Sequence, residues 1–112
     1  MATLLERLRG QREQWVKADR FEFKLRRPTR LEMQKMPAGY LVGDLIVAFV
    51  VDWRGVTEQD IVGGDKADAV AFDKDVWSEW IADRPHLWPA ILDALSAAFE
   101  EYARRQEDAA KN

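Results

Sequence analysis

Apolar side chains near the start of the chain recur at steps of three and four residues. This spacing is typical of one face of a helix, so the pattern predicts an amphipathic helix over residues 1–19, bent near Gly10. The residues that form the apolar face are Leu4, Leu5, Leu8, Trp15 and Val16.

The pattern changes to strict alternation in residues 20–26, where charged and apolar side chains take turns. Alternation places Phe21, Phe23 and Leu25 on one face of a strand and the charges on the other. A lone strand leaves backbone hydrogen-bonding groups unpaired, so this strand needs a hairpin partner or a strand from another subunit.

The middle of the chain is harder to assign. Residues 30–36 lie between two prolines and predict a short helix or a turn. Residues 40–51 are almost entirely apolar: their β-branched side chains favour a strand, whereas their length favours a buried helix, and we predict a helix. Residues 52–71 hold scattered glycines and acids, which predict a loop in which Val56 pairs briefly with residues 70–72.

The last third of the chain predicts a helix pair over residues 73–107. Asp73 can cap the first helix, Pro85 stops it, and the second begins near Trp88. The expected apolar faces comprise Val76, Trp77, Trp80 and Ile81 in the first helix, and Ile91, Leu92, Leu95, Ala98, Phe99 and Tyr102 in the second. Residues 108–112 are expected to fray.

The predicted fold is therefore a mainly α single domain over residues 1–112 with a minor β part. It comprises an amino-terminal helix (1–19), a strand, helix and loop region (20–72) and the helix pair (73–107). A chain of 112 residues is too short for two cores. The longest apolar run has seven residues, against the roughly 20 that a membrane-spanning helix needs, and the first ten residues lack a secretory signal pattern, so we expect a cytoplasmic protein.

Charge is distributed unevenly along the chain. Residues 1–36 hold ten Lys/Arg and five Asp/Glu, a net +5, and residues 37–112 hold seven and fifteen, a net −8, which together give −3. Acids are interleaved with the basic residues of the first part, so nucleic acid is not the expected partner.

Candidate catalytic residues are few. The chain has no cysteine, which excludes disulfides, thiolate metal sites and a cysteine nucleophile. His86 has no serine or carboxylate at a spacing that indicates a triad. The pairs Asp65/Asp68 and Asp73/Asp75 do not match a calcium loop. The pattern predicts no enzyme, no cofactor and no metal.

Residues 63–66 (GGDK) lack the spacing and the Ser or Thr of a phosphate-binding loop, so they predict a turn.

Five residues are candidates for binding a partner protein. Arg26, Arg27 and Arg30 place three guanidinium groups within five residues, and guanidinium groups can fork to carboxylates. The alternative is that they pair with the acidic part of this same chain. Five tryptophans are many for so small a domain; most are expected in the core, and Trp53 and Trp88 are the candidates for a contact surface.

Three short motifs resemble a known family. They are residues 50–56 (VVDWRGV), followed by a loop rich in glycine and acids; residues 70–73 (VAFD), which open the helix pair; and residues 26–31 (RRPTRL), after the alternating strand. The chain thereby resembles, over residues 20 to 105, the tail assembly chaperones encoded upstream of the tape measure gene in long-tailed bacteriophages and prophages.

The resemblance implies a mostly helical, non-catalytic protein that coats the tape measure protein and recruits tail tube subunits. It also implies self-association, action in the cytoplasm of a bacterial host, and absence from the finished virion. Many such families make a longer product by ribosomal frameshifting, and residues 110–112 (AKN) can be encoded by a slippery string.

Three alternative functions stay open. The first is a structural virion protein, such as a head–tail connector or a tail completion protein. The second is a small hydrolase that uses His86 with Asp73 or Asp75. The third is a regulator that binds nucleic acid through Arg26, Arg27 and Arg30.

Overall fold

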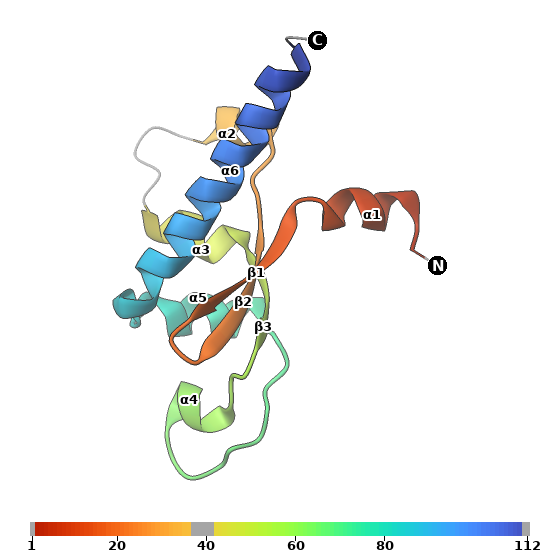
Figure 1. Cartoon of the computed structure of the whole chain (residues 1–112). Helices are drawn as coiled ribbons and strands as arrows, with labels where there is room; N and C mark the ends of the chain where they lie inside the picture. Colours follow the sequence, from red (N-terminus) through yellow and green to blue (C-terminus); the bar gives the residue numbers. More distant parts are fainter. Residues whose placement is uncertain (1, 37–41, 111–112) are drawn as a thin grey trace.

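A three-stranded sheet and a layer of helices make up the body of the protein (Figure 1). The computed structural model describes residues 2–36 and 42–110. The elements are α1 (Leu4–Gly10), β1 (Glu13–Ala18), β2 (Phe21–Arg26), α2 (Arg30–Lys35), α3 (Val42–Phe49), β3 (Val50–Arg54), α4 (Glu58–Val62), α5 (Lys74–Ala82), a 3₁₀ turn (Pro85–Leu87) and α6 (Trp88–Ala110). The prediction of a mainly helical fold with a minor β part is confirmed.

The sheet has the order β1-β2-β3, and both pairings are antiparallel. The predicted strand at residues 20–26 is β2, the central strand. Its hairpin partner is β1. We predicted a helix over residues 1–19, and this prediction is wrong for the residues after α1, because the chain there forms a strand. Trp15 and Val16 fit a helical stripe by spacing, but the central strand needs a partner on each side, and β1 supplies one.

The hairpin turn lies at Asp19 and Arg20. Asp19 has φ of 57°, in the left-handed region that aspartate tolerates better than most side chains. The register places Val16 opposite Phe23 and Ala18 opposite Phe21. These four side chains therefore share the face of the sheet that packs on the helices.

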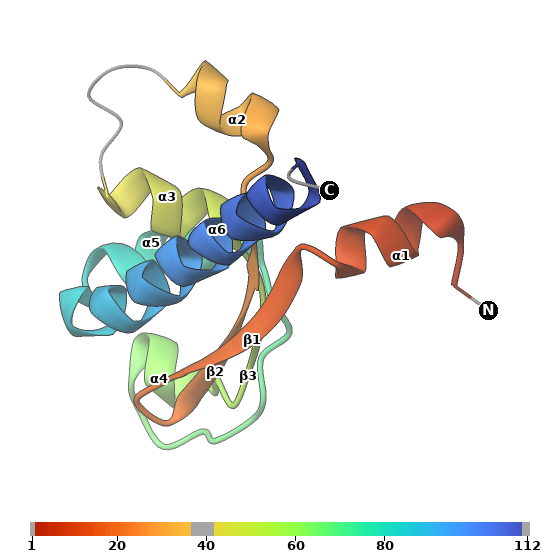
Figure 2. The same ribbon diagram turned by 45° about the horizontal axis from the view of Figure 1, so that its top comes forward.

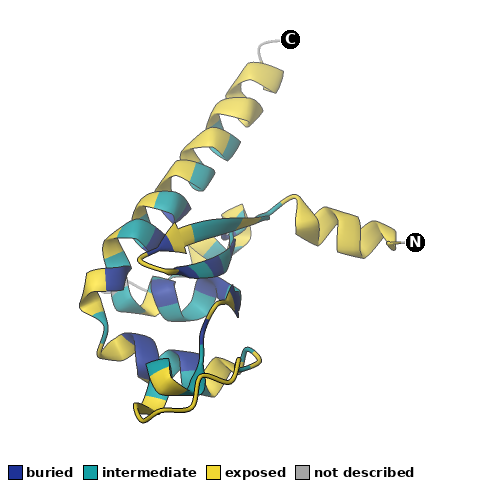
Figure 3. Ribbon diagram, turned by 60° about the horizontal axis from the view of Figure 1, so that its bottom comes forward, coloured by how far each residue is buried: buried dark blue, intermediate teal, exposed yellow. Residues whose placement is uncertain are grey.

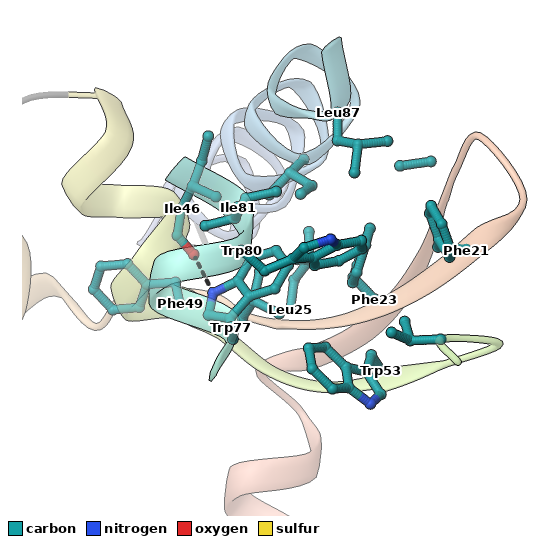
Figure 4. Packing of buried hydrophobic residues seen from close by; sticks show 14 of the residues in the cluster. Phe21, Phe23, Leu25, Ile46, Phe49, Trp53, Trp77, Trp80, Ile81 and Leu87 are labelled. Atoms are coloured by element: carbon teal, nitrogen blue, oxygen red, sulfur yellow. Dashed lines mark hydrogen bonds between the residues drawn. The ribbon is translucent and has the colours of Figure 1, made fainter. Parts of the chain in front are cut away.

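The core is formed by aromatic residues from the sheet and from α5 (Figure 4). Phe23 and Trp77 are fully buried, with ring centroids 5.1 Å apart. Trp80 packs edge-on against Phe21 at 5.4 Å and against Trp53 at 6.0 Å. Tilted and edge-on pairs such as these stabilise the fold beyond the burial of their area.

The apolar run at residues 40–51 divides into two elements. Its described part is helical through Phe49, as predicted, but the chain then turns directly into β3. Tyr40 and Leu41 lie outside the described residues. A bulge between Lys24 and Leu25 brings Val50 opposite Leu25, so that both side chains are buried.

The predicted loop of residues 52–71 also contains two unpredicted elements, the end of β3 and α4. Thr57 caps α4: its side chain accepts a hydrogen bond from the Asp60 N–H. In return, the Asp60 side chain accepts one from the Thr57 N–H, which completes a capping box. Gly63 and Gly64 follow with φ of 78° and 88°, so the predicted turn is present. The predicted pairing is confirmed, because the Val70 N–H donates to the Val56 carbonyl at 3.0 Å.

The helix pair at the end of the chain is confirmed as α5 and α6. Asp73 accepts hydrogen bonds from the backbone of Asp75 and Val76, as a capping residue does. Helix α6 runs to Ala110, so the predicted frayed tail from residue 108 is wrong for residues 108–110; residues 111 and 112 lie outside the described residues.

Helix α1 and the part of α6 that follows Leu95 project from the body (Figures 2 and 3). The Cα radius of gyration is 15.9 Å, against about 13 Å for a compact domain of this length. Helix α1 has no buried residue, and the last buried residue of α6 is Leu95. In the described residues no helix is long and apolar enough to cross a membrane.

Candidate protein interface

Helix α1 exposes a row of leucines. Leu4 is 78%, Leu5 53% and Leu8 45% exposed, and all lie within two turns of the same short helix. We call these three residues the leucine stripe. Thr3 caps the helix by accepting a hydrogen bond from the Glu6 N–H, so the segment has a proper helical start. Apolar residues gathered in this way on one surface are a candidate site of contact with another molecule.

Beside the stripe lies a groove between the start of β1, the end of β2 and the outer half of α6. It consists of two adjoining hollows of about 560 Å³ and about 220 Å³. We call it the arginine groove, and its principal side chains are Gln11, Arg12, Arg27, Arg30, Tyr102 and Arg105, with Leu8 at its edge.

Arg27 forms the floor of the groove. Its guanidinium lies over the Tyr102 ring at 3.8 Å from the centroid, and it donates a hydrogen bond to the Pro28 carbonyl at 2.9 Å. Its backbone N–H donates to the Arg12 carbonyl at 2.7 Å, which brings the two arginines together. Burial lowers the pKa of the Arg27 guanidinium; the nearby Arg12 charge lowers it further, against a raising effect of Tyr102.

The three predicted arginines do not form one cluster. Arg26 lies on the opposite side of the strand from Arg27, because neighbouring side chains on a strand alternate. There its guanidinium makes two hydrogen bonds to Glu32, at 2.7 and 2.9 Å, and lies over the Phe49 ring. Arg26 is thus occupied within the chain, whereas Arg27 and Arg30 line the groove.

The two predicted surface tryptophans also differ. Trp53 is only 5% exposed, and its indole N–H donates to the Val70 carbonyl at 2.7 Å, so it is a core residue and the prediction of an exposed Trp53 is wrong. Trp88 is half-buried, donates to the Ile81 carbonyl, and lines a largely apolar hollow of about 460 Å³ with Val47 and Ile81. Trp88 therefore keeps its place as a candidate contact residue.

The residues considered for catalysis are spread apart. His86 is exposed after the end of α5, while Asp73 caps the start of that nine-residue helix, so about 13 Å of helix separates them. Asp65 and Asp68 are exposed in the loop between α4 and α5. Among the residues that the structure describes, no group of three or more His, Cys, Asp or Glu side chains could hold a metal ion.

Comparison of the chain with models of protein families, with curated proteins and with solved structures gives no match. The assignment of a function therefore depends on the interface geometry and on the motifs of the sequence.

The sequence pattern did not indicate two parts of the interface. Arg12 and Tyr102 are 90 residues apart in the chain, and only the packing of α6 against β1 brings them together. The leucine stripe was predicted as an apolar helix face, but nothing in its spacing distinguishes a face that packs on the body from one that projects away from it.

Proposed function

We propose that this protein is a non-catalytic tail assembly chaperone of a long-tailed bacteriophage or prophage. In this proposal it holds the tape measure protein in the cytoplasm of the host and helps to recruit tail tube subunits. The observation that carries the proposal is the leucine stripe, an exposed apolar surface on a helix that stands away from the body.

The size of the stripe suits a weak contact. Burying the exposed parts of Leu4, Leu5 and Leu8 is worth roughly 3 kcal/mol in total, which corresponds to millimolar binding at best for one copy. Many copies along one long partner would convert this into firm attachment, because each bound copy contributes to the retention of the whole. A chaperone that must later be displaced by tube subunits needs contacts of this kind.

The motifs support the same function. In residues 50–56 (VVDWRGV), Trp53 is the core residue that ties β3 to the loop before α5. In residues 26–31 (RRPTRL), Thr29 and Glu32 form the capping box that starts α2. The segments that resemble the chaperone families thus hold structural positions in this fold, whereas the exposed leucine stripe lies outside them.

Co-expression with the tape measure protein encoded by the same phage tests the proposal. The wild-type chain is expected to keep that protein soluble and to copurify with it. Replacing the stripe (Leu4→Ser with Leu8→Ser) is expected to lower the copurified amount at least tenfold. The matched control is Arg7→Ser with Arg9→Ser, which changes exposed polar positions of the same helix.

Purified phage particles supply the contrary outcome. A chaperone is absent from them, so mass spectrometry should not detect this chain at stoichiometric levels. Stoichiometric presence in the particle, together with full binding by the Leu4→Ser, Leu8→Ser variant, would replace the proposal with a connector or tail completion protein.

A further inference from the structure

Three side chains of the arginine groove carry positive charge without a carboxylate beside them. Among the residues that the structure describes, none of Arg12, Arg27 and Arg30 forms an ion pair with Asp or Glu. Arg105 of the same groove is instead matched, since it pairs with Glu101 at 2.6 Å. A guanidinium presents its N–H donors as a planar fork that fits a carboxylate, so the three unmatched arginines are available for an anionic ligand.

The three unmatched arginines all line the smaller hollow of the groove, of about 220 Å³. The other residues that line it are neutral: Leu8, Gln11, Thr29 and Tyr102. In the described part of the chain, Glu13 and Glu101 line only the larger hollow. Positive charge is therefore concentrated in the smaller hollow.

Arg27 has the most to gain from a ligand. Its guanidinium is half-buried over the Tyr102 ring, and burial lowers its pKa because the charged form loses water there. A charge removed from water without an opposite charge costs free energy. A carboxylate supplied by another molecule offsets this cost.

The charged hollow continues into the leucine stripe, because Leu8 belongs to both. Backbone hydrogen bonds connect the two parts. At the end of α1 the Arg12 N–H donates to the Arg9 carbonyl at 3.0 Å, and the Arg27 N–H donates to the Arg12 carbonyl at 2.7 Å. A molecule that covers this surface must present apolar side chains and carboxylates next to each other.

We infer that the leucine stripe and the smaller hollow form one binding site for an acidic amphipathic segment of a partner protein. The stripe contacts the apolar side chains of that segment, and Arg12, Arg27 and Arg30 bind its carboxylates. The inference rests on the proposed function in taking the stripe as a contact surface, and it adds the chemistry of the segment that binds there.

A protein segment suits this site better than a nucleic acid. A phosphate backbone that runs from the smaller hollow into the larger one meets Glu13 and Glu101, and it offers no apolar side chain to the leucine stripe. A protein segment can place single carboxylates at the arginines and leave the larger hollow empty.

Two synthetic peptides of about 20 residues, long enough to form a helix, test the inference. Both carry leucines along one face; the first has glutamates beside the leucines and the second has glutamines at the same positions. Fluorescence anisotropy of each labelled peptide, with up to about 1 mM of the purified protein in about 50 mM salt, measures binding. Charge contacts are only weakly screened at this salt concentration.

The wild type is expected to bind the glutamate peptide at least tenfold more tightly than the glutamine peptide. This preference should disappear in about 500 mM salt, which screens charges but leaves the apolar contacts. A tenfold preference corresponds to about 1.4 kcal/mol, a modest total for three carboxylate pairs at partly exposed arginines.

The groove variant is Arg12→Gln with Arg30→Gln. Neither side chain makes a hydrogen bond or an ion pair among the described residues, so the fold is expected to persist. This variant should bind the two peptides within about twofold of each other. The matched control is Lys66→Gln with Lys74→Gln, which removes equal charge from exposed positions outside the groove and should keep the tenfold preference.

The stripe variant, Leu4→Ser with Leu8→Ser, should bind both peptides more weakly than the wild type does. Equal binding of the two peptides by the wild type, or a groove variant that keeps the tenfold preference, would overturn the inference. So would a labelled single-stranded RNA or DNA that the wild type binds more tightly than the glutamate peptide and that the groove variant no longer binds.

The inference and the proposed function can fail separately. If the chain copurifies with the tape measure protein but binds both peptides equally, the inference is wrong and the proposed function stands. If the chain prefers the glutamate peptide through Arg12 and Arg30 but does not retain the tape measure protein, the inference stands and the proposed function is wrong.

Discussion

The indole N–H groups of the tryptophans fix how distant segments join. Trp53 donates to Val70, Trp77 to Ile46, Trp80 to Asp60 and Trp88 to Ile81, all backbone carbonyls. Composition alone predicted a core rich in tryptophan, because so large a ring is costly to leave in water. It could not predict which carbonyl each ring would reach, since that depends on the packing of segments far apart in sequence.

Trp53→Phe tests the hydrogen bond that anchors the loop of residues 63–72 before α5. The ring stays apolar, but the Val70 carbonyl loses its indole donor, so the free energy of unfolding is expected to fall by about 1–2 kcal/mol. Hydrogen exchange should quicken across residues 63–72. Trp15→Phe is the control, because the Trp15 ring lies against Arg54 on the other face of the sheet and is not part of the core cluster. An equal loss there would refute the anchoring role.

The Arg26–Glu32 pair gives stability a pH dependence. The Arg26 hydrogen bond lowers the pKa of Glu32 to about 2, well below the ordinary value of 4.5, and Thr29 hydrogen bonds lower it further, against a raising effect of burial. Because the folded-state pKa is the lower one, the stabilisation is complete above about pH 4.5 and is lost as the pH falls toward 2.

Glu32→Gln is expected to lower the free energy of unfolding by about 1 kcal/mol at pH 7, a modest value because the Glu32 side chain is 37% exposed. Urea titrations at pH 7 and pH 3 should show the difference from wild type shrinking at the lower pH. Glu100→Gln on the exposed face of α6 should show neither effect. A difference in the free energy of unfolding that is equal at pH 7 and pH 3 would mean that the variant is less stable only because the capping box is lost.

At the scale of elements, periodicity predicted β2, α5 and α6 because each has a single clear pattern, and the prolines on either side predicted a short helix or turn at α2. Strand β1 was missed because residues 13–18 are too few to separate a period of two from a period of 3.6, and the leucines before them favour a helix. The division of the apolar run into α3 and β3 was missed for a related reason: both elements are buried, so neither alternates visibly. Pairing across the sheet decides both cases.

Removal of residues 1–10 tests whether α1 is independent of the body. With no buried residue in this helix, the free energy of unfolding is expected to change by less than about 0.5 kcal/mol. Ile91→Ala, which empties a fully buried position in α6, should instead cost about 2–5 kcal/mol in the same urea titration. A loss above 2 kcal/mol on removing residues 1–10 would mean that α1 packs on the body in solution.

At the scale of the whole molecule, the interface combines parts that no local pattern connects. The sequence supplied the basic cluster at residues 26–30 and the excess of acid after residue 36. Only the fold separates Arg26 from Arg27 and joins Arg27 to Arg12 and Tyr102. The sequence thus predicted that the candidate interface is basic, but not which residues form it.

The order of the elements along the chain also determines which apolar surface is uncovered during synthesis. The β1–β2 hairpin leaves the ribosome before α5 and α6, with Phe21, Phe23 and Leu25 on one face. The side chains that cover this face lie between Trp77 and Leu95, and the last of them is synthesised 70 residues after Leu25. At about 5–20 residues per second, the aromatic face of the nascent hairpin stays uncovered for roughly 4–14 seconds, and exposed apolar surface of this kind is prone to aggregation.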